Sequence, residues 1–109
     1  MAEKSQFLYR IVPTRPEMLV SGPTERESAV IDAHFVHLQK LAADGVLLMA
    51  GRTVDTGPDT WGIVVFQAAS LAEAEALMRG DPAIAQGVMH CALFPYRVAV
   101  WSDAWRAGA

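Results

Sequence analysis

The sequence predicts an α+β domain in which an antiparallel sheet is covered by helices on one of its faces. Two observations predict this fold. Short runs rich in β-branched and aromatic residues alternate with segments of helical periodicity, and each main helical segment begins at a Ser or Thr that is followed three residues later by Glu. The elements come in the order βαββαβ, as two similar halves, which is the ferredoxin-like pattern.

In the first half, a strand is expected over 7–12, followed by a loop over 13–23 that is rich in Pro and Gly and has little regular structure. A helix then begins at Thr24. Its partner Glu27 completes a capping box, in which each side chain satisfies a free backbone N–H of the other. Gly45 ends this helix.

In the second half, strands are expected over 46–52 and 61–68, and a second helix over 70–80. Asp81 precedes a proline, which is the usual way to begin a short helical turn. The last strand is expected over 88–100, bent or broken at its proline.

The length of 109 residues fits one domain, 1–109, with a core over about 7–100 and a loosely held tail over 102–109. Cys91 is the only cysteine, so an intramolecular disulfide is excluded and a cytoplasmic location is expected.

The composition also limits the classes of partner that are expected. No apolar run approaches the ~18–20 residues of a membrane span, and the N-terminus does not resemble a signal peptide. Nine basic residues are scattered among twelve acidic ones, with no basic stripe, so neither nucleic acid nor a membrane is an expected partner.

The expected sheet is apolar on both faces, although the helices can cover only one. Alternation along the strand expected over 61–68 puts Trp61, Ile63 and Val65 on one face of the sheet and Val64 and Phe66 on the other. Along the strand over 46–52 it puts Leu48 and Ala50 on one face and Leu47 and Met49 on the other. The second face must therefore meet another surface. We expect a homodimer joined through its sheet faces, with a cavity for a small-molecule ligand.

A histidine in a helix, a leucine-rich stretch, a glycine and a strand ending in Ala-Gly follow one another over 34–51 (HFVHLQKLAADGVLLMAG). The second half contains SLAEAEA over 70–76, then Asp81–Pro82 and Gly87. This order and spacing, from about residue 7 to 100, resembles the YCII-related (YciI-like) family of the dimeric α/β barrel superfamily.

The resemblance implies a dimeric α/β barrel and a functional pair formed by His34 and Asp81. It also implies a kinship with dehydrochlorinases and muconolactone isomerases that act in the breakdown of aromatic compounds. The sequence departs from the family pattern at two positions. Arg52 follows Ala-Gly where proline is usual, and Ala83 follows Asp81–Pro82 where a large apolar residue is frequent.

His34 lies within the apolar arc of the first helix, where a leucine would be expected. It is either a general acid or base or a buried histidine satisfied by the backbone. Asp81 either caps its helical turn only or also orients the imidazole of His34. These two residues are the candidate catalytic pair.

Three residues are candidates for substrate binding. Arg52 could hold a carboxylate, or it could pair with Asp55 or Asp59. Trp61 and Tyr9 could line an aromatic-binding cavity, although aromatic residues in strands are more often part of a core or an interface.

No metal or other cofactor is expected. His37 lies one turn from His34, but a metal would need His90 or a carboxylate as a third ligand, and no metal-site signature occurs. A solvated helix edge is the simpler interpretation of His37.

Two functions are consistent with these residues. The first is a cofactor-independent isomerase or lyase that transfers a proton on, or eliminates a group from, a small acid or lactone, including those derived from aromatic rings. The alternative is a non-catalytic dimeric module that binds a small ligand or assists another enzyme.

Overall fold

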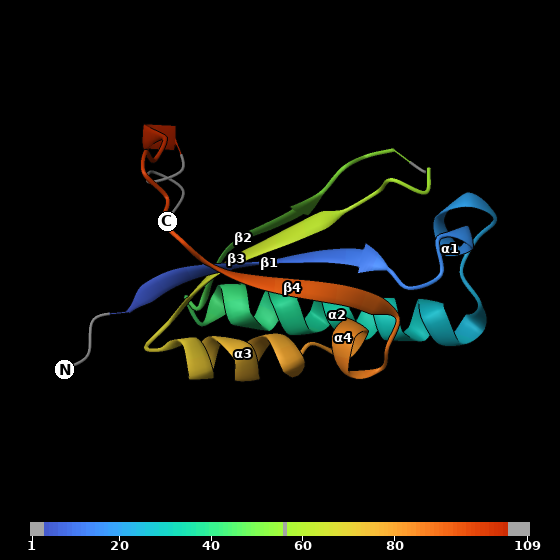
Figure 1. The fold of residues 1–109 in the computed structure, drawn as a ribbon, viewed down its shortest axis with the longest axis horizontal. Coiled ribbons are helices and arrows are strands. Elements are labelled where there is room, and N and C mark those ends of the chain that lie inside the picture. The colour runs from blue at the N-terminus through green and yellow to red at the C-terminus, as the bar shows by residue number, and fades with distance from the viewer. Residues whose placement is uncertain (1–3, 56, 105–109) are drawn as a thin grey trace.

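The computed structural model describes residues 4–55 and 57–104 and has the ferredoxin-like α+β fold that the sequence predicts (Figure 1). The strands, which form one antiparallel sheet in the order β2-β3-β1-β4, are β1 (Ser5–Pro13), β2 (Leu47–Arg52), β3 (Gly62–Ala68) and β4 (Met89–Tyr96). The helices are α1 (Glu17–Val20), α2 (Glu25–Ala43), α3 (Leu71–Arg79) and α4 (Pro82–Ala85). Figure 1 shows α2, α3 and α4 on the same side of the sheet.

The core lies between this helical layer and the two central strands. Along β1, Phe7, Tyr9 and Ile11 are buried and point toward the helices. Val64 and Phe66 of β3 extend the same apolar surface, and they are opposite Tyr9 and Phe7 in the register. The alternation expected for β3 is therefore observed.

The expected alternation is wrong in β2, because a β-bulge lies between Leu47 and Met49. Leu47 pairs with Phe66 and Ala50 with Val64, so both β2 residues point toward the helices. The extra residue of a bulge moves the side chain of every later residue in the strand to the opposite face of the sheet. As a result, Arg52 also lies on the helical side of the sheet.

The segment before α2 is more ordered than expected. Residues 17–20 form α1, in which Met18 is buried. Arg15 fixes this segment to the start of α2, because its Nη2 and Nε donate to the Glu27 carboxylate at 2.6 and 3.0 Å. The same carboxylate accepts from the Thr24 backbone N–H at 2.8 Å and completes the predicted capping box.

The last strand is shorter than expected and ends at Tyr96, opposite Gln6 of β1. Beyond Tyr96, the Val98 backbone N–H donates to the side chain of Gln6 and not to the β1 backbone, so the chain leaves the ladder. Pro95 lies within it, which is tolerated because β4 is an edge strand. Part of the predicted tail, residues 105–109, lies outside the described residues.

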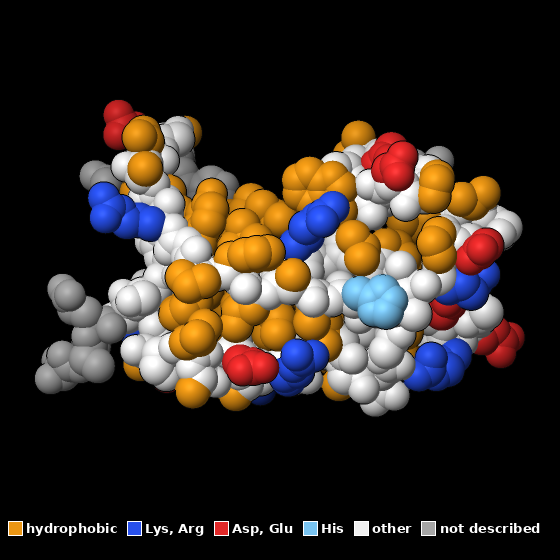
Figure 2. All heavy atoms as spheres, in the orientation of Figure 1, with side chains coloured by type: hydrophobic (Ala, Val, Ile, Leu, Met, Phe, Trp, Pro, Cys, Tyr) orange, Lys and Arg blue, Asp and Glu red, His pale blue; other side chains and the backbone are white. Residues whose placement is uncertain are grey.

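The second face of the sheet, which we call the outer face, carries Leu8, Arg10 and Val12 of β1, Ile63 and Val65 of β3, and Ala92, Phe94 and Tyr96 of β4. Large apolar side chains there are accessible: Phe94 is 49% and Tyr96 46% exposed. Figure 2 shows hydrophobic side chains gathered over the strands. None of the described helices is long and apolar enough to cross a membrane.

The contact with Arg15 gives the chain a measurable acid sensitivity. The hydrogen bond from Arg15, followed by that from the Thr24 backbone, lowers the pKa of Glu27 from 4.5 to about 2. A lowered pKa in the folded state adds stability that is fully present above the unfolded value and is lost as the pH falls through the folded one.

We therefore expect Glu27→Gln to lower the free energy of unfolding at pH 7, and the difference from the parent chain to disappear as the pH falls from 4.5 to about 2. Urea unfolding at several pH values measures this difference. Glu25→Gln is the control, because it removes a carboxylate of the same helical turn that forms no ion pair among the described residues.

Candidate active site

A cavity of about 490 Å³ lies between α2 and the sheet. Its walls are mainly aliphatic and come from α2, from the ends of β1, β2 and β3, and from the segment that holds α1. The apolar lining residues are Ile11, Pro13, Met18, Leu19, Ile31, Phe35, Leu38, Ala42, Leu47, Ala50, Ile63, Val64 and Met89. They include Leu47 and Ala50, which the bulge in β2 brings to the same side of the sheet. The volume and lining are typical of a site for a small organic molecule.

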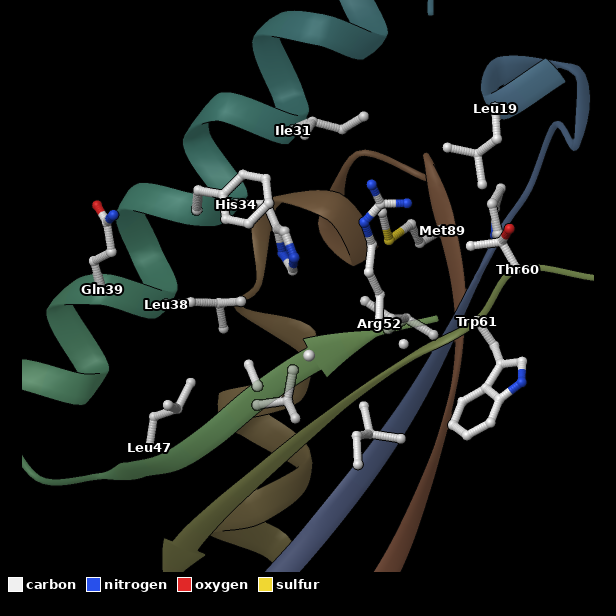
Figure 3. Close-up of a pocket in the computed structure, with 18 of the residues that line it drawn as sticks. Leu19, Ile31, His34, Leu38, Gln39, Leu47, Arg52, Thr60, Trp61 and Met89 are labelled. Carbon is white, nitrogen blue, oxygen red and sulfur yellow. The ribbon is translucent and has the colours of Figure 1, made fainter. Parts of the chain in front are cut away.

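Few polar side chains reach this cavity, and two of them face it from opposite walls. His34 extends from α2 and Arg52 from β2 into the space between helix and sheet (Figure 3). Thr60 also lines the cavity, but its hydroxyl already donates to the Asp55 and Gly57 carbonyls at 2.9 and 3.0 Å. Gln39 also borders the cavity, but its amide lies on the side of α2 away from the sheet (Figure 3). His34 and Arg52 are therefore the polar groups that extend furthest into the cavity.

His34 and Asp81, 47 residues apart, form a buried hydrogen bond of 2.7 Å between Nδ1 and Oδ1. His34 is 5% exposed and Asp81 is fully buried. Asp81 is also the N-cap of α4, and its Oδ1 accepts from the Ala83 backbone N–H at 2.9 Å. One carboxylate thus caps a helix and holds the histidine, so the two roles weighed for Asp81 coexist.

The structure does not bring Tyr9 to the cavity, where the sequence suggested a binding role. Its side chain is buried in the core, and its hydroxyl donates to Asp81 Oδ2 at 2.6 Å. Tyr9, Asp81 and His34 form a hydrogen-bonded chain from the centre of the sheet to the cavity wall. Sequence reasoning missed this contact, since no local pattern links two residues that are 72 positions apart.

The hydrogen bonds keep Asp81 ionised. Burial acts to raise the pKa of Asp81, but hydrogen bonds from His34 and Tyr9 outweigh it, so the pKa is lowered. Burial and the nearby Asp81 charge raise the pKa of Tyr9, which therefore remains a neutral donor. Because a carboxylate can only accept, His34 must donate its Nδ1–H. In the neutral ring, Nε2 then carries the lone pair.

Trp61 borders the cavity at the start of β3, but its ring points away from His34 (Figure 3). The guanidinium carbon of Arg10, an outer-face residue, lies 5.4 Å from the centre of the ring. This distance is typical of a cation–π contact. The ring of Trp61 therefore belongs to the outer face.

His37 is not a solvated residue at the edge of its helix. It is partly buried, and its Nε2 is buried with no hydrogen-bond partner in the described part of the chain. Within residues 4–55 and 57–104, no group of three or more His, Cys, Asp or Glu side chains is placed to hold a metal ion.

Comparison with known proteins identifies the family of the chain. The model of the YCII-related domain matches residues 7–97. The chain belongs to this family. Comparison with curated proteins finds no match.

A solved structure with the same fold is the 5-chloro-2-hydroxyhydroquinone dehydrochlorinase TftG of Burkholderia phenoliruptrix, in complex with 2,5-dihydroxybenzoquinone. It matches with a TM-score of 0.62 and 22% identity, covering 84% of this chain and 93% of that one. At this identity, the match supports the fold of the YCII-related chain and leaves its chemistry to be argued from its own residues.

The role of Tyr9 can be tested with Tyr9→Phe, which removes only the hydroxyl. We expect the free energy of unfolding at pH 7 to fall by about 1–3 kcal/mol, because a buried carboxylate loses a donor. We also expect the pKa of Asp81 to rise, so that stability is lost at higher pH during acidification than in the parent chain.

Chemical denaturation and a ¹³C NMR titration of the Asp81 carboxyl measure the two effects. Tyr96→Phe, at an exposed tyrosine of β4, is the control. An unchanged titration of Asp81 in Tyr9→Phe would show that the hydroxyl does not stabilise the charge.

Proposed function

We propose that this YCII-related protein is a cofactor-independent enzyme that moves a proton on a small, largely apolar acid or lactone, in an isomerisation or an elimination. One observation carries the proposal. His34 lies at the wall of an apolar cavity, and its Nδ1 is held by the buried Asp81 carboxylate at 2.7 Å. With Nδ1 occupied by Asp81, the lone pair of Nε2 would be the group of His34 available to a molecule in the cavity.

In the proposed reaction, Nε2 removes a proton from a carbon next to a carbonyl group, and the C–H electron pair moves toward the carbonyl oxygen. The imidazolium that forms is stabilised by Asp81, which also fixes the orientation of the ring. In an isomerisation, His34 returns the proton to another carbon. In an elimination, the electron pair returns from the carbonyl oxygen to form a carbon–carbon double bond to the neighbouring carbon, the carbon–halogen bond on that carbon breaks, and halide leaves with its electron pair.

The relative in Burkholderia supports the chemical class. Its name describes a dehydrochlorinase, and the ligand in its structure is a small oxygenated ring. A cavity of about 490 Å³ in the present chain has room for a molecule of that size. The two proteins share the fold, so a similar ring is a reasonable first substrate to test.

The composition of the cavity walls favours one further candidate, a module that binds a small ligand without transforming it. Most of the lining residues are aliphatic, and such a surface binds an apolar molecule without help from His34. The two functions differ in what the loss of the imidazole does. Catalysis requires the imidazole of His34, and binding by the apolar walls does not.

We expect His34→Gln to lower kcat/KM by at least about 100-fold while leaving ligand affinity nearly unchanged, because a general base contributes roughly 10²–10⁴-fold. Two assays apply: chloride release from 5-chloro-2-hydroxyhydroquinone, and deuterium uptake from D₂O into muconolactone. His90→Gln, at an exposed histidine of β4, is the control. Binding without turnover in the parent chain would favour the binding module.

The outer face supports a second proposal, that two copies associate through their sheets. Phe94 on this face is 49% exposed, and apolar neighbours surround it on β1 and β4. A contiguous apolar sheet surface marks an interface more often than a free surface. A two-fold pair would bury this face on both copies at once.

We expect the parent chain to be a dimer at micromolar concentration and Phe94→Asp to shift it toward monomer, because a carboxylate would be desolvated in the interface. Sedimentation velocity measures both states. Leu71→Asp is the matched control, since Leu71 is 55% exposed on α3, away from the outer face. A monomeric parent chain would overturn this proposal.

A further inference from the structure

We propose that Arg52 makes the cavity selective for ligands that carry an anionic oxygen group, either a carboxylate or an ionised ring hydroxyl, on a compact apolar skeleton. The inference rests on the proposed function in that the same cavity holds the substrate. It adds a chemical class of ligand, recognised by a residue that takes no part in the proton transfer.

The β2 bulge is the first reason, because it determines where Arg52 points. Arg52 is opposite Gly62 in the register, on the side of the sheet that faces α2. Without the extra residue at the bulge, the side chain would lie on the outer face. Figure 3 shows it extending into the cavity toward α2.

Gly62 is the second reason. A Cβ atom at this position would lie 3.1 Å from the Gly51 carbonyl oxygen and 3.2 Å from Ile11 Cγ1, and 3.5 Å from Arg52 Cβ. The backbone of β2 and the side chain of Ile11 therefore pack tightly beside the base of Arg52. Glycine lets the two strands and the base of Arg52 approach one another without a collision.

The third reason is charge. Within residues 4–55 and 57–104, the ion pairs formed by side chains are Arg15–Glu27, His34–Asp81 and Arg79–Glu75, and none involves Arg52. No ion pair joins Arg52 to Asp55 or Asp59 among the described residues. The pKa of Asp55 is lowered chiefly by a hydrogen bond with Thr53, and the charge of Arg52 is the smallest of the causes, so the guanidinium keeps most of its capacity for a ligand. The guanidinium instead faces a cavity whose other walls are mainly aliphatic.

Such an arginine favours an anion. The guanidinium can donate two parallel hydrogen bonds to a carboxylate, and charge-assisted bonds of this kind are stronger than neutral ones. Arg52 is exposed to solvent at the cavity, so a ligand can reach its guanidinium directly. With the anion at Arg52 on β2, the other end of the ligand would lie toward His34 on α2, where a proton could be removed (Figure 3).

Two matched pairs of ligands test the proposal, and they separate the two sources of the anion. Benzoate and benzamide have the same shape and differ in charge. Pentafluorophenolate and pentafluoroaniline make the same comparison for an ionised ring hydroxyl. Calorimetric or NMR titration gives the dissociation constant of each ligand for the parent chain, for Arg52→Gln and for Arg79→Gln, which removes an exposed arginine of α3.

We expect the parent chain to bind the anion of at least one pair about 10-fold more tightly than its neutral partner, since hydrogen bonds to charged groups are worth a factor of this order. Arg52→Gln should bring that ratio close to one, and Arg79→Gln should preserve it. Equal affinity for anion and neutral partner in both pairs would overturn the proposal. So would a ratio that survives Arg52→Gln, or the failure of both anions to bind with a dissociation constant below about 10 mM.

The same titrations with His34→Gln keep this inference separate from the proposed function. The variant lacks the base but keeps Arg52, so it should retain the preference for the anion whether or not the parent chain proves to be an enzyme. Loss of the preference in His34→Gln, with Arg52 intact, would show that His34 is the group that recognises the anion, and it would overturn the assignment to Arg52.

Discussion

The buried carboxylate of Asp81 is the interaction on which the site depends. It accepts hydrogen bonds from Tyr9 on β1, His34 on α2 and the Ala83 backbone on α4, so it joins the sheet to two helices. A buried charge is tolerated only when its desolvation is offset by partners of this kind. The contacts that make Asp81 acceptable in the core are the same contacts that orient His34 toward the cavity.

The cavity exists because α2 and the sheet do not meet closely along their whole length. The segment that contains α1 covers one end, and the Arg15–Glu27 pair holds it there. The bulge in β2 puts Ala50 on the same side of the sheet as Leu47, where both are wall residues. Local departures from regular structure therefore shape the site more than the regular elements do.

The two faces of the sheet have separate roles. The helical side buries the core and carries His34, Asp81 and the cavity. The outer side carries Trp61 with Arg10 over its ring, together with exposed aromatic residues of β4. Strand alternation produces this division, because neighbouring residues such as Trp61 and Gly62 point to opposite faces. A residue that is adjacent in sequence to a cavity residue can therefore lie on the outer face of the sheet.

The sequence by itself determined the order of elements, the helix starts at Thr24 and Ser70, the family, and the pairing of His34 with Asp81 through the family resemblance. The elements, the helix starts and the family depend on periodicity, caps and motif spacing, whereas the pairing of His34 with Asp81, across 47 residues, came from the family resemblance alone. Only the tertiary structure decided that Tyr9 supports Asp81, that Trp61 turns to the outer face, and that Arg52 faces the cavity. The reason is physical: a contact across 72 residues and the register change at a bulge depend on how strands and helices pack, and no short stretch of sequence encodes that packing.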